Sequence, residues 1–152
     1  MKTLILGLGN PILGDDGVGF RAIQSLKAKS SGQDITTLES SASGLGLLDL
    51  LIGYDKAIII DAIQTKDGNI GEVYRLEVSQ LNVTRHAASP HDVNLATALE
   101  LGKRLNLALP QEISIIAIEI PSTYTFTEEC SPDVEKAIPL AVDMALAILT
   151  EE

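Results

Sequence analysis

The run Ala57–Ile63 constrains the fold of this chain most strongly, because apolar residues fill it almost without interruption. A short apolar run of this kind is typical of a strand buried inside a sheet. A second run of the same character, Thr3–Leu8, lies near the start of the chain. Strands of this type need cover on both faces of their sheet, so the rest of the chain must supply helices.

Helical patterns do alternate with strand-like segments along the sequence. Helices are expected at Gly17–Lys29, over a short stretch in which Leu45, Leu48 and Ile52 share a face, from Pro90 to about Arg104, and along a last stripe of Val134, Ile138, Val142, Ala145 and Leu149, which Pro139 should only perturb. Further strands are expected at Asp34–Glu39, Gly71–Val78 and Ile113–Glu119. Gly71–Val78 follows the preceding strand closely enough to form a hairpin with it, as an antiparallel edge strand.

This alternation predicts an α/β fold. We expect a three-layer α/β/α sandwich, of the phosphorylase/hydrolase-like kind, in which helices cover both faces of a mostly parallel, mixed sheet of about five strands. A length of 152 residues with 45% hydrophobic content is enough for one core and too short for two ordinary domains. A single domain over residues 1–152 is therefore expected.

Charge and composition limit the partners. There are 11 basic and 21 acidic side chains, a formal charge of -10, which repels phosphate backbones, so nucleic acid is not expected as a partner. Cys130, the single cysteine, cannot form an internal disulfide, and this favours the reducing cytoplasm. No apolar run approaches the roughly 20 residues of a membrane span, and Thr3–Leu8 is a poor signal peptide, so a soluble protein is expected.

Two neighbouring carboxylates, Asp15 and Asp16, stand in the loop that follows the first strand, GLGNPILGDDGVG. A helix N-terminus needs one capping oxygen and attracts negative charge by roughly 0.3–1 kcal/mol, so either acid alone would satisfy local structure. The structural alternative is that both are caps or solvated acids. One of them is otherwise surplus to local structure.

Asp61 and His91 occupy two further positions of interest. Asp61 follows Ile58–Ile60 where a buried strand emerges, and a charge there has a desolvation cost unless it caps a turn or has a function. Ser89 suits a helix N-cap and Pro90 the first helical position, which places His91 in a first turn, where the dipole disfavours imidazolium. A lone histidine is usually structural, and His86 has no comparable positional argument.

Together, Asp16, Asp61 and His91 would give a divalent metal three protein ligands and leave positions for water or substrate. Ligands of such sheets collect at the carboxyl ends of the strands, which is where these residues are expected. The sequence contains no H-E-x-x-H and no G-x-S-x-G motif. Cys130 stands at the expected start of the last helix, and we expect it to be buried there rather than to act as a nucleophile.

The glycine-rich start permits two other readings. In a dinucleotide-binding G-x-G-x-x-G motif that begins at Gly7, the third glycine would fall at Ile12, so no organic cofactor is expected. Peptidyl-tRNA hydrolases also carry a GLGNP-like start on a related architecture, which makes a hydrolase-like esterase an alternative. The Asp15–Asp16 pair and the charge of -10 fit tRNA poorly.

Three segments in this order, GLGNPILGDDGVG, IIIDAI and SPHDVNL, resemble the hydrogenase maturation endopeptidases over the whole chain. The resemblance implies a protease that removes a C-terminal extension from the large-subunit precursor of a nickel-iron hydrogenase after nickel insertion. It also implies that Asp16, Asp61 and His91 are the metal-binding and catalytic positions; some members have glutamate where Asp16 stands. The chain departs from the family pattern at Glu39–Gly44, where many members carry an Asp-Gly-Gly-Thr-like segment.

The mechanism expected from this resemblance uses nickel that the precursor already holds, so that metal on the substrate licenses cleavage. Nickel or a bound water would polarise the scissile carbonyl, and a carboxylate or His91 would move protons. An alternative keeps Asp16 and Asp61 as a proton-sharing pair of the aspartic-protease type, and another is a non-enzymatic nickel-binding or assembly module. The expected partner is the precursor, and the protease is expected to act as a monomer.

Overall fold

The computed structural model of the chain describes residues 1–30, 32, 34–42, 45–81, 90–122 and 125–151, and at residues 81 and 90–94 it describes the backbone alone. The elements run in the order β1 (Thr3–Leu8), the 3-10 helix η1 (Gly14–Gly17), α1 (Val18–Lys27), β2 (Ile35–Ser40), α2 (Leu45–Leu51), β3 (Lys56–Ile63), β4 (Val73–Glu77), α3 (Val78–Leu81), α4 (Pro90–Arg104), β5 (Glu112–Glu119) and α5 (Pro132–Leu149). The expected strands and helices are all found, within a few residues at their ends.

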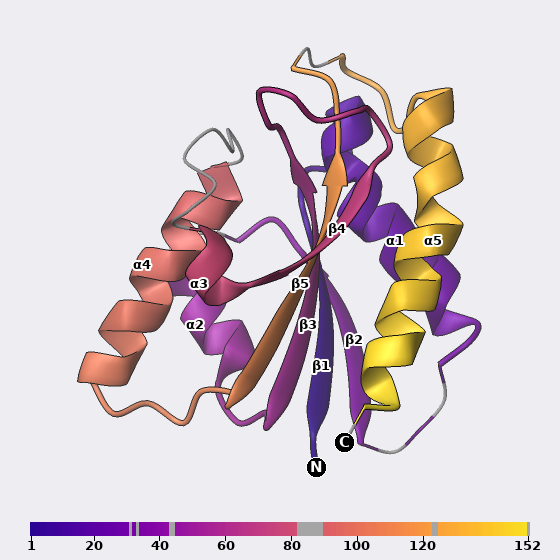
Figure 1. Cartoon of the computed structure of the whole chain (residues 1–152). Helices are drawn as coiled ribbons and strands as arrows, with labels where there is room; N and C mark the ends of the chain where they lie inside the picture. Colours follow the sequence, from indigo (N-terminus) through magenta and orange to yellow (C-terminus); the bar gives the residue numbers. More distant parts are fainter. Residues whose placement is uncertain (31, 33, 43–44, 82–89, 123–124, 152) are drawn as a thin grey trace.

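Five strands form one sheet in the order β2-β1-β3-β5-β4. The first four strands in this order are parallel to one another, and β4 runs antiparallel to β5. The mostly parallel, mixed sheet expected from the sequence is therefore confirmed (Figure 1). Helices α1 and α5 cover one face, while α2, α3 and α4 lie on the other, so the fold has three layers.

The expected hairpin between β3 and β4 is wrong, although β4 is an antiparallel edge strand. Strand β5 lies between them, because β4 pairs with β5 alone, from Val73 opposite Ile118 to Glu77 opposite Ser114. The connection of residues 64–72 crosses the end of β5 and is fixed there by two backbone bonds: Gly71 N–H donates to the Glu119 carbonyl, and Glu119 N–H donates to the Glu72 carbonyl. Strand β5 can form hydrogen bonds along both of its edges, and it pairs with β3 on one side and with β4 on the other. The short connection after β3 would by itself have favoured pairing of β4 with β3.

The strands carry alternating side chains to two separate cores. Ile58 and Ile60 belong to the core under α1 and α5, whereas Ala57 and Ile59 belong to the core under α2 and α4. Since side chains of a strand alternate between faces, Asp61 lies on the α2/α4 face. The amphipathic stripe expected for the last helix is also confirmed, and α5 continues through Pro139.

The apolar face expected for the short helix is only partly correct. Leu48 is buried as expected, but Leu45 and Ile52 are exposed, and α2 also buries Leu47 and Leu51. The sequence LGLLDLL offers leucines on more than one side of a helix, so periodicity alone does not select the face that meets the sheet. Among the described residues, none of the helices combines the length and the apolar character needed to cross a bilayer.

Helix α1 approaches the sheet unusually closely at its start. A Cβ atom on Gly19 would lie 2.6 Å from the carbonyl oxygen of Ile60 and closer still to that of Leu8. Gly7, on the facing strand, would likewise clash with the Gly19 carbonyl if it carried a Cβ. These glycines let the segment after β1 settle directly on the carboxyl ends of β1 and β3.

Candidate active site

The candidate site lies where β1 ends and η1 settles against β3. The backbone between them folds back tightly: the Leu13 N–H donates to the Asn10 carbonyl and the Asp16 N–H donates to the Leu13 carbonyl, each at 3.2 Å. Gly9 has a φ of 146°, and a Cβ atom there would overlap the Asp16 carbonyl oxygen. Glycine at this position therefore allows η1 to return over the end of β1.

Asp16 is buried in this loop, with 7% of its surface exposed. Its Oδ2 accepts the backbone N–H of Asn10 at 3.0 Å. Helix α1 begins at Val18 and its N-cap residue is Gly17, so Asp16 is not the N-cap that the structural alternative proposed. The loop therefore holds the Asp16 carboxylate in a fixed position at this edge of the sheet.

Asp15 has a different partner. Its two oxygens accept the backbone N–H and the hydroxyl of Ser131, the residue that precedes α5. This carboxylate thus ties the β1–α1 loop to the start of the last helix. The two adjacent acids therefore have different partners, and the contact of Asp15 with Ser131 is structural.

Asp61 lies inside β3, two residues before its end, as the expected strand Ala57–Ile63 placed it. It is the first residue of β3 beyond the ladder with β1, whose last pair is Gly7 with Ile60, and it pairs with Ala117 of β5 on its other side. Only 1% of Asp61 is exposed, and its Oδ1 accepts the N–H of Ala62 at 2.8 Å. Desolvation of a carboxylate buried so deeply is costly, and a strongly buried acid at this edge of the sheet is a candidate for a functional role.

His91 is the second residue of α4, at the helix's first turn as expected. Helix α4 packs on the α2/α4 face through Leu95, Ala98 and Leu99, and its end leads to the amino end of β5, so its start lies at the edge that carries Asp16 and Asp61 (Figure 1). The His91 side chain, His86 and the expected cap Ser89 lie outside the described residues. No three metal-binding side chains converge among the described ones, so the three-ligand site stays a prediction.

Glu119 is a further buried acid near this edge, which the sequence reasoning did not single out. It is buried at the end of β5, on the same face as Asp61, and accepts the N–H and the hydroxyl of Thr65 at 2.7 and 2.6 Å. Tyr74 adds a third donor at 3.0 Å, so the β3–β4 loop folds around one carboxylate. The available signal was the one that identified Asp61, an acid at the end of a buried run.

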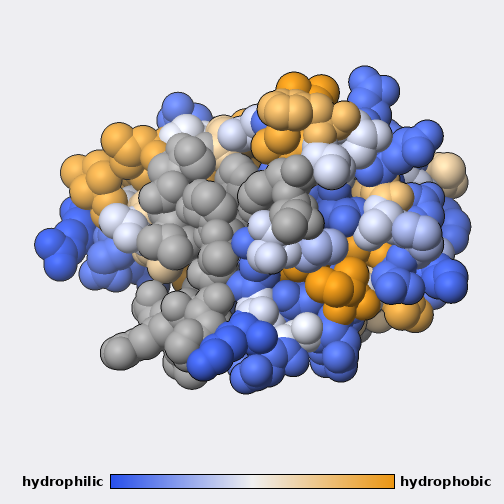
Figure 2. Space-filling view, turned by 90° about the horizontal axis from the view of Figure 1, so that it is seen from above, coloured by the Kyte–Doolittle hydropathy of each residue, from blue (hydrophilic) through white to orange (hydrophobic). Residues whose placement is uncertain are grey.

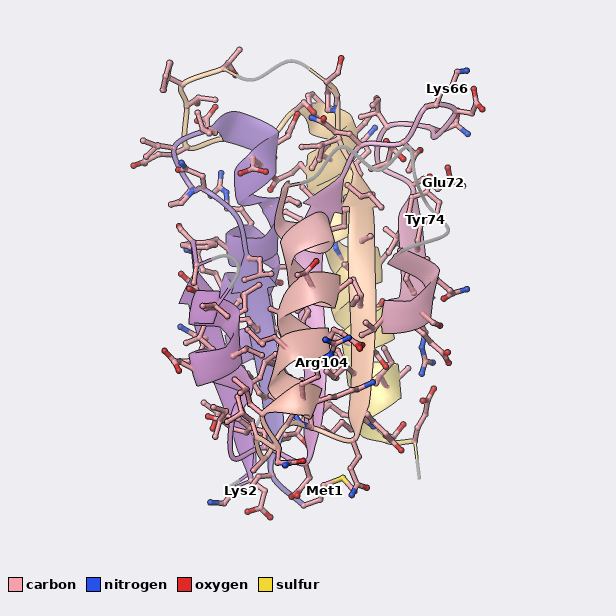
Figure 3. All side chains as sticks on the ribbon, turned by 90° about the vertical axis from the view of Figure 1, so that its left-hand side faces the viewer. Met1, Lys2, Lys66, Glu72, Tyr74 and Arg104 are labelled. Atoms are coloured by element: carbon pink, nitrogen blue, oxygen red, sulfur yellow. The ribbon has the colours of Figure 1, made fainter. Side chains whose placement is uncertain are left out.

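Tyr74 lies between two acids. Its hydroxyl is 2.9 Å from Glu72 Oε2 as well as 3.0 Å from Glu119 Oε1, and Figure 3 shows Glu72 and Tyr74 together beneath the loop that carries Lys66. Burial, followed by the hydrogen bonds to Glu72 and Glu119, raises the pKa of Tyr74 far above its usual range. The phenol therefore keeps its proton and serves as a donor.

Cys130 is half-buried beside Asp15. Burial first, and then the Asp15 carboxylate, raises the pKa of its thiol. Since the thiolate is the reactive form, a raised pKa leaves Cys130 a weak nucleophile. This agrees with the expectation that Cys130 does not carry the chemistry.

Comparison with known proteins identifies the family. The family model HycI, described as hydrogenase maturation protease, matches residues 20–148. The hydrogenase 2 maturation protease of Escherichia coli is 29% identical over 153 aligned residues, which cover 99% of this chain and 92% of that protein.

Two solved structures have the same fold. The hydrogenase-maturating endopeptidase HybD of E. coli superimposes with a TM-score of 0.84 and 27% identity, covering 98% of this chain and 92% of that one. The [NiFe] hydrogenase maturation protease HybD of Thermococcus kodakarensis gives 0.74 and 28%, covering 97% and 99%. The family match and these relatives, which cover nearly the whole chain, confirm the resemblance: the chain belongs to the hydrogenase maturation protease family and is an endopeptidase.

Proposed function

We propose that this endopeptidase removes the C-terminal extension of a nickel-iron hydrogenase large-subunit precursor after nickel has been inserted. We further propose that Asp16, Asp61 and His91 bind the nickel that the precursor carries. The observation that supports this most directly is the burial of Asp16 and Asp61 on two different elements at one edge of the sheet, where η1 lies against β3. The first turn of α4, with His91, starts at the same edge.

The chemistry of this donor set suits a metal that arrives with the substrate. Carboxylate and imidazole ligands bind borderline divalent ions such as nickel, but they are harder ligands than thiolates and do not readily displace them from the metal. The three side chains would therefore add to the coordination of nickel already held by cysteines of the precursor, without extracting it. Nickel bound in this way would polarise the scissile carbonyl or a water molecule.

The chain's own residues then have positioning and proton-transfer tasks. The fold holds Asp16 through the Asn10 N–H and Asp61 through the Ala62 N–H, so both carboxylates are preorganised before the substrate arrives. Preorganised groups lose little free energy to reorganisation during the reaction. One of the two carboxylates, or His91, would accept the proton of the attacking water and pass it to the leaving amine.

The decisive experiment compares nickel-loaded and nickel-free precursor with the purified protease and follows the precursor's C-terminus by mass spectrometry. Wild type should shorten the loaded precursor only, and Asp16→Asn, Asp61→Asn and His91→Gln should each slow cleavage by at least roughly tenfold. Asp15→Asn is the matched control, because it removes the neighbouring charge without touching the proposed ligands. Equal cleavage of nickel-free precursor would instead favour a metal-free Asp16–Asp61 pair.

We also infer that the protease works as a monomer in the cytoplasm. Its single cysteine and its net charge of -10 support a dispersed protein in a reducing compartment. Size-exclusion chromatography with light scattering should give a mass near 16.2 kDa across the working concentration range. A mass twice as large would contradict this assignment.

A further inference from the structure

Ile12 and Phe126 form an exposed apolar pair beside the candidate site. Phe126 is 88% exposed and Ile12 is 52% exposed, although both are large hydrophobic side chains. An isolated exposed residue of this kind is common on protein surfaces. These two are not isolated, because the segments that carry them are joined.

The joint is a short parallel bridge between Leu13 and Thr127. Thr127 N–H donates to the Ile12 carbonyl at 3.0 Å, and Gly14 N–H donates to the Thr127 carbonyl at 2.8 Å. Ile12 and Phe126 each precede a bridge partner, and the bond from Thr127 N–H to the Ile12 carbonyl brings their two segments side by side with both side chains exposed. The result is one surface, which we call the Ile12–Phe126 patch.

The patch is held in place from both ends. Beyond the bridge, the Asp15 carboxylate binds Ser131, so the segment from Thr127 to Ser131 is fastened to the β1–α1 loop twice. That loop also contains Asp16, whose N–H donates to the Leu13 carbonyl. The patch is therefore continuous with the loop that carries a proposed ligand. Figure 2 looks onto this edge of the sheet and shows hydrophobic side chains in patches among hydrophilic ones.

Exposed acidic residues follow Phe126 closely in the chain. Glu128, Glu129, Asp133 and Glu135 are all exposed on the next residues of the chain. None of these four acids makes an ion pair with any described residue. Their charge would attract basic residues of a partner, at a range limited by salt to about 8–10 Å.

We infer that the Ile12–Phe126 patch is an exosite that binds a segment of the hydrogenase large-subunit precursor in which apolar and basic residues are combined. This rests on the proposed function, because that function requires a protein substrate to approach this edge. The aromatic ring supplies the apolar anchor, and the acids set the charge of the segment that fits around it. The exosite binds a folded precursor away from the cleaved bond.

The test uses the full-length protease and nickel-loaded precursor, with Phe126→Ser and Ile12→Ser as variants. Leu105→Ser is the matched control, because Leu105 is 59% exposed but follows the end of α4, in the connection that leads to the amino end of β5. Phe126→Ser should raise KM at least roughly tenfold and leave kcat within about threefold, since the ring anchors the substrate and does not touch the reacting bond. Leu105→Ser should change neither constant.

Binding of the precursor is measured in parallel by biolayer interferometry at several salt concentrations. Phe126→Ser should weaken binding, and Glu128→Gln with Glu129→Gln should reduce its salt dependence. Unchanged binding and KM in Phe126→Ser and Ile12→Ser would overturn the exosite, whereas normal binding without cleavage of the loaded precursor by wild type would overturn the proposed function alone. A loss equal to that of Leu105→Ser would also refute the exosite, because it would show a general effect of surface substitution.

Discussion

The carboxylate of Asp15 holds Ser131 by two hydrogen bonds, one from the backbone N–H at 2.6 Å and one from the hydroxyl at 2.9 Å. The two residues are 116 positions apart in the chain. The contact joins the loop after β1 to the start of α5, next to an acid of the proposed site. It gives the first of the two adjacent aspartates a structural task that does not depend on the start of α1.

Replacing these two acids separately should separate stability from activity. Asp15→Ala should lower the free energy of unfolding by about 1–3 kcal/mol, because it leaves two donors of Ser131 without their acceptor. Asp16→Asn should change it by less than about 1 kcal/mol, since a carboxamide oxygen can still accept the Asn10 N–H. Urea denaturation gives both values.

Cleavage of the loaded precursor should show the opposite ranking. Below the unfolding temperature, Asp15→Ala should keep kcat within about threefold, while Asp16→Asn should lose at least roughly tenfold in kcat/KM. If folded Asp15→Ala loses more activity than Asp16→Asn, the roles proposed here for the two acids are assigned the wrong way round.

Much of the sheet could be predicted because the buried strands carry the signal in their own residues. The apolar runs of β1, β3 and β5 identify strands whatever their neighbours are. The partner of β4 could not be predicted in this way, because it depends on β5, which enters the sheet about forty residues later in the chain and takes the place beside β3. The residues of β3 and β4 themselves carry no information about where β5 enters the sheet.

The site shows the same division. Asp16 and Asp61 could be located at the carboxyl edge because Asp16 follows a recognisable strand and Asp61 lies near the end of another. The local residues did not distinguish Asp15 from Asp16, since the partner of Asp15 is Ser131 at the far end of the chain, and only the family resemblance selected Asp16. Glu119 was missed because its donors, Thr65 and Tyr74, meet it only through the crossing of the β3–β4 loop.

Gly19→Ala should destabilise the protein through a backbone clash. The added Cβ would lie 2.6 Å from the Ile60 carbonyl, so the start of α1 would have to move away from β1 and β3. We expect a loss of about 1–3 kcal/mol, typical of overpacking. Gly46→Ala is the matched control within a helix, because its nearest neighbour is the Ala42 Cβ at 3.4 Å. It should stabilise the protein by up to about 1 kcal/mol, and a loss in both variants would show that the clash is not the cause.

Glu119→Gln should loosen the β3–β4 loop. The carboxylate accepts three hydrogen bonds, and the amide group of glutamine cannot accept at one of the two positions. A donor of Thr65 or Tyr74 is then left unsatisfied in a buried place, at a cost of about 1–3 kcal/mol. Hydrogen exchange of residues 64–73 should accelerate selectively, while that of α5 stays unchanged. Uniform acceleration would indicate global destabilisation instead.

The raised pKa of Tyr74 predicts a loss of stability at alkaline pH. The unfolded tyrosine ionises near pH 10, whereas folded Tyr74 keeps its proton to higher pH, so the contribution is complete below about pH 10 and falls as the pH rises above it. The free energy of unfolding should therefore drop more in wild type than in Tyr74→Phe between about pH 8 and about pH 11. Equal drops in the two proteins would show that Tyr74 has no such effect.

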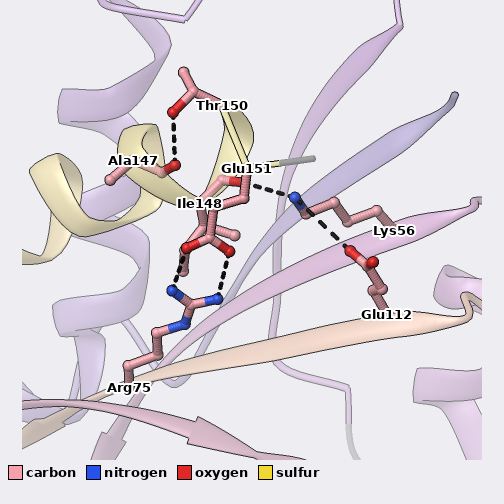
Figure 4. A network of polar contacts seen from close by, with 7 residues as sticks. All are labelled: Lys56, Arg75, Glu112, Ala147, Ile148, Thr150 and Glu151. Atoms are coloured by element: carbon pink, nitrogen blue, oxygen red, sulfur yellow. Dashed lines mark hydrogen bonds and ion pairs between the residues drawn. The ribbon is translucent and has the colours of Figure 1, made fainter.

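Lys56 should stabilise the end of α5 more than the exposed ion pair beside it. The Lys56 ammonium is buried, donates to the Ile148 carbonyl at 2.6 Å and lies 3.9 Å from Glu112, whereas Arg75 and Glu151 form a bidentate pair with nearly half of each side chain exposed (Figure 4). A cation at the C-terminus of a helix also meets the favourable end of its dipole. Lys56→Met keeps most of the apolar stem but removes the donor, so we expect a loss of about 1–3 kcal/mol and faster hydrogen exchange over the last turn of α5.

Arg75→Gln is the comparison, with an expected loss of no more than about 1 kcal/mol, because water screens exposed pairs. Lys56 begins β3 at the amino edge of the sheet, and the Arg75 guanidinium pairs with Glu151 just beyond α5, so kcat for the loaded precursor should be the same in both variants as in wild type. A larger loss of stability in Arg75→Gln than in Lys56→Met would mean that the exposed pair, and not the buried ammonium, holds the end of α5.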